Sequence, residues 1–136
     1  MNMLTGLCER LGLNRSKPLG ARGEDIASRY LQRLGYKIVA RGESSRSGEL
    51  DIIAVDRRTV VFVEVKTRRS ADKGHPSDAV DHAKQKRLTV LALQYLQRHD
   101  LLDYESRFDV IAITWPLAAK RPQVEHFKHA FQSTTV

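Results

Sequence analysis

Two stretches with the composition of buried strands also carry charged side chains. They read GELDIIAVD (residues 48–56) and TVVFVEVKTR (residues 59–68). Their candidate functional residues are Glu49, Asp51, Glu64 and Lys66. Burying a charge costs free energy unless the charge is paired or binds a metal. These four residues therefore either face open solvent or serve a function.

The register of the two strands decides whether these side chains can act together. A turn centred between residues 57 and 58 places Asp51 directly opposite Glu64. It also places Glu49 opposite Lys66, and because strand side chains alternate, all four lie on one face. Two facing carboxylates repel each other unless a cation lies between them. The opposite face of the first strand then carries Leu50, Ile52 and Ala54.

Carboxylate oxygens at that separation suit Mg²⁺ or Mn²⁺, with water and phosphate at the remaining positions. The backbone carbonyl of Val65 is a further candidate ligand. Lys66 could orient or deprotonate an attacking water, or neutralise charge that develops on phosphorus. Together these groups fit metal-assisted hydrolysis of a phosphodiester. The alternative is a solvated strand face, because Glu-x-Lys alternation is common and a turn of three or five residues would break the register.

A helix is predicted after Pro18, with apolar residues at helical spacing and Gly35 as its stop. Glu24 lies on the flank of the apolar stripe, whereas Asp25 points nearly opposite. Gly20 and Gly23 fall on the apolar face, where they would permit close approach of another backbone. Glu24 is therefore the acidic residue of this helix that is expected at the sheet.

Five strands and a second helix complete the expected domain. The strands are expected at 36–42, 49–56, 59–67, 106–115 and 123–131, with polar loops at 43–48 and 68–78. The second helix begins after a Ser77 cap and runs to about His99, with Lys84 on its inward line. The hairpin strands are apolar on both faces, which favours helices on both faces of a mixed sheet. The expectation is an α/β domain over 18–132, flanked by tails at 1–17 and 133–136.

Composition narrows the class of partner. The 136 residues include 23 Lys and Arg against 16 Asp and Glu, which gives a net charge of +7. This surplus favours nucleic acid over an acidic membrane surface as the partner. Cys8 is the single cysteine, so an intramolecular disulfide and a cysteine zinc cluster are excluded. The chain shows neither a membrane-spanning apolar run nor a signal peptide, and a cytoplasmic location is expected.

Basic residues near the site end of the hairpin are candidates for contacts with a phosphate backbone. Arg41, Arg46 and Arg68 lie in or beside the adjoining loops, although loop arginines are as commonly just solvated. Asp109 in the fourth strand is expected to form a structural pair with Arg107 or a helix lysine. His126 and His129 have no acidic residue at metal-ligand spacing, so a surface or packing role is expected for both.

Several of these segments resemble a known group of proteins. Glu24, the Asp51 of GELD and the EVK of residues 64–66 resemble the PD-(D/E)XK nuclease pattern. The segments GxxGEDIASRYLQRLGY, RSGELDIIAVD, VFVEVKTR, AVDHAKQKRL and RFDVIAI look like the uncharacterised bacterial YraN family. Members of that family are distantly similar to archaeal Holliday junction resolvases. The resemblance extends over roughly residues 18–131.

The resemblance implies a restriction-endonuclease-like fold with three α/β/α layers around a mixed sheet. It implies Asp51 and Glu64 as metal carboxylates and Lys66 as the catalytic lysine. Glu24 matches an acidic position on the first helix and is a further candidate metal ligand. Gln85, or less closely Lys84, matches a polar position on the second helix, and both are candidates for contacts with nucleic acid. The residue before Leu50 and Asp51 is Glu49, so the proline of the family pattern is absent.

Three functions are considered, of which the most distant is a protein–protein adaptor whose basic surface is incidental. The first is a Mg²⁺- or Mn²⁺-dependent endonuclease acting on DNA, including branched or structured DNA. The second is a catalytically silent nucleic-acid-binding module with the same fold. Resolvase-like relatives act as dimers, so a homodimer is compatible with the first function.

Overall fold

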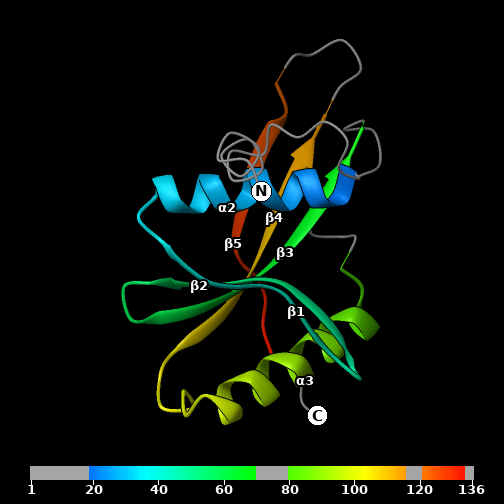
Figure 1. Ribbon diagram of the computed structural model, residues 1–136. Coiled ribbons are helices and arrows are strands. Elements are labelled where there is room, and N and C mark those ends of the chain that lie inside the picture. Colours follow the sequence, from blue (N-terminus) through cyan, green and yellow to red (C-terminus); the bar gives the residue numbers. More distant parts are fainter. Residues whose placement is uncertain (1–18, 70–79, 116–120, 134–136) are drawn as a thin grey trace, which may run out of the picture.

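The computed structural model describes residues 19–69, 80–115 and 121–133, and it has an α/β fold in which two helices pack on a mixed five-stranded sheet (Figure 1). The elements are α2 (Leu19–Arg33), β1 (Lys37–Ser45), β2 (Gly48–Asp56), β3 (Thr59–Arg68), α3 (His82–Arg98), β4 (Ser106–Thr114) and β5 (Gln123–Phe131). The predicted order of helix, three strands, helix and two strands is confirmed. The predicted tail at 1–17 and most of the predicted loop at 68–78 lie outside the described residues.

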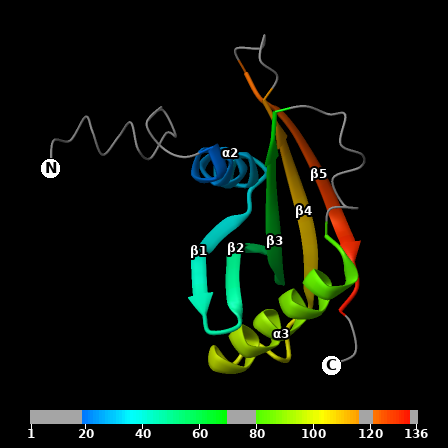
Figure 2. The ribbon, with the colours of Figure 1, turned by 90° about the vertical axis from the view of Figure 1, so that its right-hand side faces the viewer.

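The five strands follow one another across the sheet in the order β1-β2-β3-β4-β5. Neighbouring strands are antiparallel except β3 and β4, which are parallel. Parallel strands need a crossover connection, and the segment that contains α3 supplies it. Figure 2 shows α2 beside the upper part of β3 and α3 across the lower part of the sheet.

Each helix packs on its own set of strand residues. Ala27 and Leu31 of α2 belong to a buried cluster with Ile52, Ala54, Val61, Val63, Ile111 and Ile113. Leu88, Leu91, Ala92, Tyr95 and Leu96 of α3 belong to another, with Leu50, Ile53, Val60, Phe62, Phe108 and Val110. Within β3 and β4 the two sets alternate along the strand, so each helix covers a different face. None of the helices in the described part of the chain is long and apolar enough to cross a membrane.

Two predicted element boundaries are wrong. The expected loop at 43–48 is mostly strand, because β1 continues to Ser45 and pairs with Gly48 of β2 around a tight turn. The second helix begins at His82, so Val80 and Asp81 precede it. The side chain of Asp81 accepts a hydrogen bond of 2.8 Å from the Lys84 amide and caps the helix. The predicted cap, Ser77, lies outside the described residues.

The glycines of α2 differ in what surrounds them. A Cβ atom on Gly23 would lie 2.0 Å from Oγ1 of Thr67 in β3, so only glycine lets the helix approach this strand. The predicted close approach is confirmed for Gly23. For Gly20 it is wrong, because a Cβ there would meet no atom within 4 Å.

We expect Gly23→Ala to destabilise the protein by about 1–3 kcal/mol, because the new methyl group must displace Thr67 or the helix. Gly20→Ala is the matched control and should stabilise by about 0.5–1 kcal/mol through helix propensity. Urea denaturation of both variants measures the two changes. Combining Thr67→Ala with Gly23→Ala should recover part of the stability that Gly23→Ala loses. Equal effects of the two glycine substitutions would contradict the packing argument.

Candidate metal centre

The candidate metal centre lies where β2 and β3 separate. Their ladder runs from Asp56–Thr59 to Ile52–Val63, which confirms the predicted register over this part of the hairpin. Beyond Ile52, β2 continues beside β1, whereas β3 continues beside β4. The two strands therefore form a fork, and the predicted facing pair of Asp51 and Glu64 falls at its opening and not within the ladder.

Asp51 lies at the start of this fork. Its Oδ2 atom accepts a hydrogen bond of 2.9 Å from the Val65 amide, which has left the ladder with β2. Leu50 packs in the cluster with Ile53, whereas Ile52 packs in the other cluster. The expectation that Leu50 shares a face with Ile52 is therefore wrong. The regular alternation of side chains breaks where β2 turns away from β3.

Three carboxylates meet at the fork. Glu24 of α2 lies with Glu49 and Asp51 of β2, and one oxygen of each is within 4.8 Å of the others. Glu24 and Asp51 are half-buried, and Glu49 is exposed. The prediction that Glu24 looks toward the sheet is consistent with this placement. Oxygen ligands at such spacing suit Mg²⁺ or Mn²⁺.

Two acids of this cluster, Asp51 and Glu24, have raised pKa values and resist ionisation. Burial raises the pKa of Asp51 to about 7, and the carboxylates of Glu64 and Glu24 add to this effect. The Val65 amide and Lys84 oppose it only in part. Burial also raises the pKa of Glu24 above its ordinary value. A divalent cation bound between these oxygens would remove the repulsion that causes part of both shifts.

The expectation that Glu64 shares a face with Asp51 is wrong, because Asp51 clusters with a residue of α2, whereas Glu64 contacts α3 on the other face of the sheet. Glu64 is buried, and its Oε1 atom lies 2.5 Å from Nζ of Lys84 in α3. This ion pair confirms that Lys84 is on the inward line of its helix. Glu64 lies close enough to raise the pKa of Asp51, but the compact group of carboxylates contains Glu49 in its place. The charge of Glu64 is balanced by a lysine of the chain itself.

Lys66 is exposed on β3, two residues after Glu64. Within the described ranges it forms no ion pair with an acidic side chain.

Asp25, expected to point away from the sheet, is 5% exposed and forms an ion pair of 2.7 Å with Arg41 of β1. That expectation was wrong, because the long β1 brings an arginine over the flank of α2. Arg41 thus has a structural partner at the place where a DNA contact was expected.

The other candidates for nucleic-acid contacts also differ in their surroundings. Arg46 is exposed in the β1–β2 turn, three residues before Glu49. Nε of Arg68 donates to Oγ1 of Thr114 at 3.2 Å. Nε2 of Gln85 donates to the Val80 carbonyl at 2.9 Å, which ties the start of α3 to the preceding segment. Among Arg41, Arg46 and Arg68, Arg46 is the one that makes no hydrogen bond or ion pair with another described side chain.

The sequence comparisons identify the family. The model of an uncharacterised protein family, UPF0102, matches residues 23–113. The chain belongs to the UPF0102 family. This match includes the fork and every carboxylate named above. The expected membership of an uncharacterised bacterial family is thereby confirmed.

Relatives of this UPF0102 protein occur in distant bacteria. A UPF0102 protein of Geobacter sulfurreducens is 50% identical over 121 residues, which cover 89% of this chain and 94% of the relative. One of Rhodopirellula baltica is 46% identical, with 91% of this chain and 76% of the relative covered. One of Rhodococcus opacus is 45% identical, with 83% and 95% covered. Their names state the family and no activity.

This UPF0102 chain has a second charged cluster, which the sequence reasoning recognised only in part. Asp109 of β4 is fully buried and accepts from Nε of Arg107 at 3.0 Å, which confirms the expected pair. The expected packing role of His126 is consistent with its buried side chain, and its Nε2 lies 2.7 Å from Oδ2 of Asp109, an acidic partner that the sequence did not indicate. Burial alone would raise the pKa of Asp109, but His126 and Arg107 outweigh burial and lower it. His126 and Asp109 are 17 residues apart in sequence and meet because β4 pairs with β5. The spacing of residues along the chain does not reveal such a contact.

The stability of this UPF0102 protein should depend on the protonation of Asp51. The pKa of Asp51 is about 7 in the fold against 3.8 ordinarily, so between these values the folded protein holds a proton that the unfolded chain releases. Stability is therefore lost as the pH rises through this window. Asp51→Asn keeps an acceptor for the Val65 amide and lacks this titration.

We expect Asp51→Asn to be more stable than the parent at pH 8 by about 2–4 kcal/mol in EDTA. At pH 4 the two proteins should have nearly equal stability. Urea denaturation across this pH range measures the difference. Parallel pH profiles for the parent and the variant would show that Asp51 titrates normally.

Proposed function

We propose that this protein is a divalent-metal-dependent endonuclease of the PD-(D/E)XK type that hydrolyses DNA phosphodiesters. On this proposal its sheet and two helices form the restriction-endonuclease-like α/β/α arrangement. The observation that carries the proposal is the meeting of Glu24, Glu49 and Asp51 at the fork between β2 and β3. Such a cluster is unfavourable without a cation, and metal binding offers a reason for it.

The residues of the fork have distinct proposed roles. Asp51, Glu24 and Glu49 would hold Mg²⁺ or Mn²⁺, while the Val65 amide fixes the orientation of the Asp51 carboxylate. A bound divalent ion would polarise the phosphate and lower the pKa of an attacking water. Lys66 carries an exposed ammonium on β3, from which it would orient that water or neutralise charge on the phosphate.

Net charge and the placement of arginines support DNA as the substrate. The chain carries +7, and the exposed Arg46 and Arg69 adjoin the open end of the fork. Arginines in such positions fix a phosphate backbone without reading its sequence. Resolution of a four-way junction needs two cuts, so we expect two copies of the chain on such a substrate.

A catalytically silent nucleic-acid-binding module is the second candidate. The Lys84–Glu64 ion pair favours it, because this lysine already neutralises a carboxylate that the nuclease pattern assigns to the metal. An active enzyme would have to exchange this internal cation for a metal ion, or bind the metal with Glu49 in place of Glu64. Nucleic-acid binding alone requires neither.

The deciding experiment titrates the parent protein with Mn²⁺ by calorimetry and incubates it with linear, nicked and four-way DNA. We expect Mn²⁺ to bind and at least one DNA to be cut in a metal-dependent way. Binding that weakens with salt, without cutting, would favour the silent module. Failure to bind DNA at low salt would refute both candidates.

A further inference from the structure

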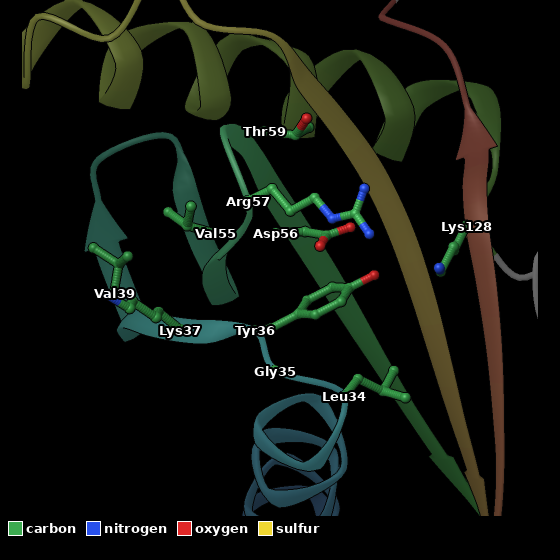
Figure 3. A pocket seen from close by; sticks show the side chains of 10 residues that line it. All are labelled: Leu34, Gly35, Tyr36, Lys37, Val39, Val55, Asp56, Arg57, Thr59 and Lys128. Atoms are coloured by element: carbon green, nitrogen blue, oxygen red, sulfur yellow. The ribbon is translucent and has the colours of Figure 1, made fainter.

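A second site lies at the other end of α2, away from the fork. It is a pocket of about 880 Å³, and its polar lining consists of Tyr36, Lys37, Asp56, Arg57, Thr59 and Lys128 (Figure 3). We call it the Tyr36 pocket. From Glu24 to Leu34 at its rim, α2 and its continuation extend by about 15 Å, so the pocket is separate from the candidate metal centre. Its volume is within the range of small-molecule sites.

The charge of the Tyr36 pocket is positive. Lys37, Arg57 and Lys128 are exposed, and none forms an ion pair with an acidic residue in the parts of the chain that the structure describes. Arg57 comes from the β2–β3 turn and Lys128 from β5, and both line the pocket (Figure 3). Asp56 is the acidic residue of the lining, and its Oδ2 atom lies 3.1 Å from Nη1 of Arg107. The cations are therefore available to an anionic ligand.

The hydroxyl group of Tyr36 can donate to such a ligand. Its oxygen accepts a hydrogen bond of 2.6 Å from Nη2 of Arg107, so its own proton remains free to be donated. Arg107 is held in turn by the buried Asp109, and Tyr36 as a whole residue is 5% exposed. These contacts fix the hydroxyl rigidly at the wall of the pocket. In Figure 3 the hydroxyl lies below the end of Arg57, and the end of Lys128 lies to its right beyond β4.

The remaining wall is apolar and largely uncovered. Leu34 is 50% exposed and Val39 is 52% exposed, and both line the pocket together with Val55. Neighbouring exposed apolar side chains beside polar groups often mark a binding site. A ligand that satisfies the whole pocket carries negative charge at one end and a flat or apolar group at the other.

The backbone at the rim has an unusual conformation. Arg57 has a φ of 59° and His129, next to Lys128, has a φ of 50°. Non-glycine residues in the left-handed region cost free energy and concentrate at binding sites. Arg57 lies in the β2–β3 turn, and His129 lies in β5 where the register of the β4–β5 pairing shifts.

We propose that the Tyr36 pocket binds a nucleotide. The phosphate groups would lie between Arg57, Lys128 and the Tyr36 hydroxyl, and the nucleoside would cover Leu34 and Val39. This site goes beyond the proposed nuclease function and does not depend on it. Its cations fit the charge of a phosphate chain. Inorganic phosphate alone would leave its apolar wall uncovered.

The test is a titration of the ¹⁵N-labelled protein with ADP in EDTA, followed by NMR chemical shifts and by calorimetry. We expect shifts at the amides of Tyr36, Arg57 and Lys128. Lys128→Gln should weaken ADP binding by about fivefold or more, since one charged contact contributes roughly 1 kcal/mol or more. Lys86→Gln, which removes an exposed lysine from α3, is the matched control and should change nothing.

Three further titrations separate the sources of binding. Adenosine and pyrophosphate should each bind more weakly than ADP, and Asp51→Asn should leave ADP binding unchanged. Pyrophosphate that binds as tightly as ADP would overturn the nucleotide assignment. So would the absence of shifts at millimolar ADP, or a Lys128→Gln variant that loses affinity for a DNA duplex but not for ADP. Loss of ADP binding in Asp51→Asn would place the ligand at the fork.

Discussion

Asp51→Ala should abolish both Mn²⁺ binding and DNA cleavage. Asp51 is the most central of the three clustered carboxylates, because it also accepts the Val65 amide and interacts with Glu64. Its removal leaves Glu24 and Glu49, which come from different elements. We expect the rate of cleavage to fall by about a thousandfold or more, as is typical when a group that stabilises charge in the transition state is removed. Calorimetry and single-turnover cleavage measure the two effects.

Lys66→Ala provides the contrast. It should leave Mn²⁺ binding unchanged and reduce single-turnover cleavage by about 10²–10⁴-fold, the range for a group that transfers a proton or stabilises developing charge. Lys86→Ala on α3 removes an equally exposed lysine and should retain activity. If Lys66→Ala cleaves normally while Asp51→Ala does not, the metal centre is supported and the role of the lysine is refuted. If both cleave normally, the fork is not the active site.

Arg107→Met should cause the largest loss of stability of the substitutions considered, about 3–5 kcal/mol. The side chain of Arg107 is 9% exposed and contacts Asp109, Asp56 and the Tyr36 hydroxyl. Without Arg107, the negative charge of the fully buried Asp109 would have to be balanced by His126. Breaking one partner of a buried ion pair costs more than the pair contributes when intact. Urea denaturation at pH 7 measures the loss.

Two further variants test this explanation. Arg33→Met, on the exposed surface at the end of α2, is the control and should change stability by less than about 0.5 kcal/mol. Arg107→Met combined with Asp109→Asn should be more stable than Arg107→Met alone, because the uncompensated charge is removed. The loss of stability of the double variant could instead equal the sum of the losses of the two single variants. In that case the residues act independently, and the broken ion pair is not the cause of the loss in Arg107→Met.

The sequence was sufficient for features that depend on neighbours along the chain. Alternation and turn position predicted the β2–β3 register, which the ladder from Asp56–Thr59 to Ile52–Val63 confirms. Helical spacing predicted the inward position of Lys84. Both features are properties of a single helix or hairpin, so a periodic pattern contains the information needed.

Features that depend on distant segments were not predictable in this way. The fork arises because β2 continues with β1 while β3 continues with β4, and no pattern within the hairpin indicates where the ladder ends. This separation brings Glu49 into the carboxylate cluster and leaves Glu64 to Lys84. The pair of His126 and Asp109 likewise depends on the pairing of β4 with β5, which comes much later in the sequence than the hairpin.

The connection between β3 and β4 has a consequence for the order in which the molecule assembles. The clustered acids and Lys66 all precede α3, within one helix and a three-stranded antiparallel meander. Such local pairings form faster than parallel ones, which must first close a long crossover. During synthesis the acidic cluster can therefore take shape before β4 emerges. The Tyr36 pocket must wait for β5, which supplies Lys128 as almost the last part of the sheet to be added.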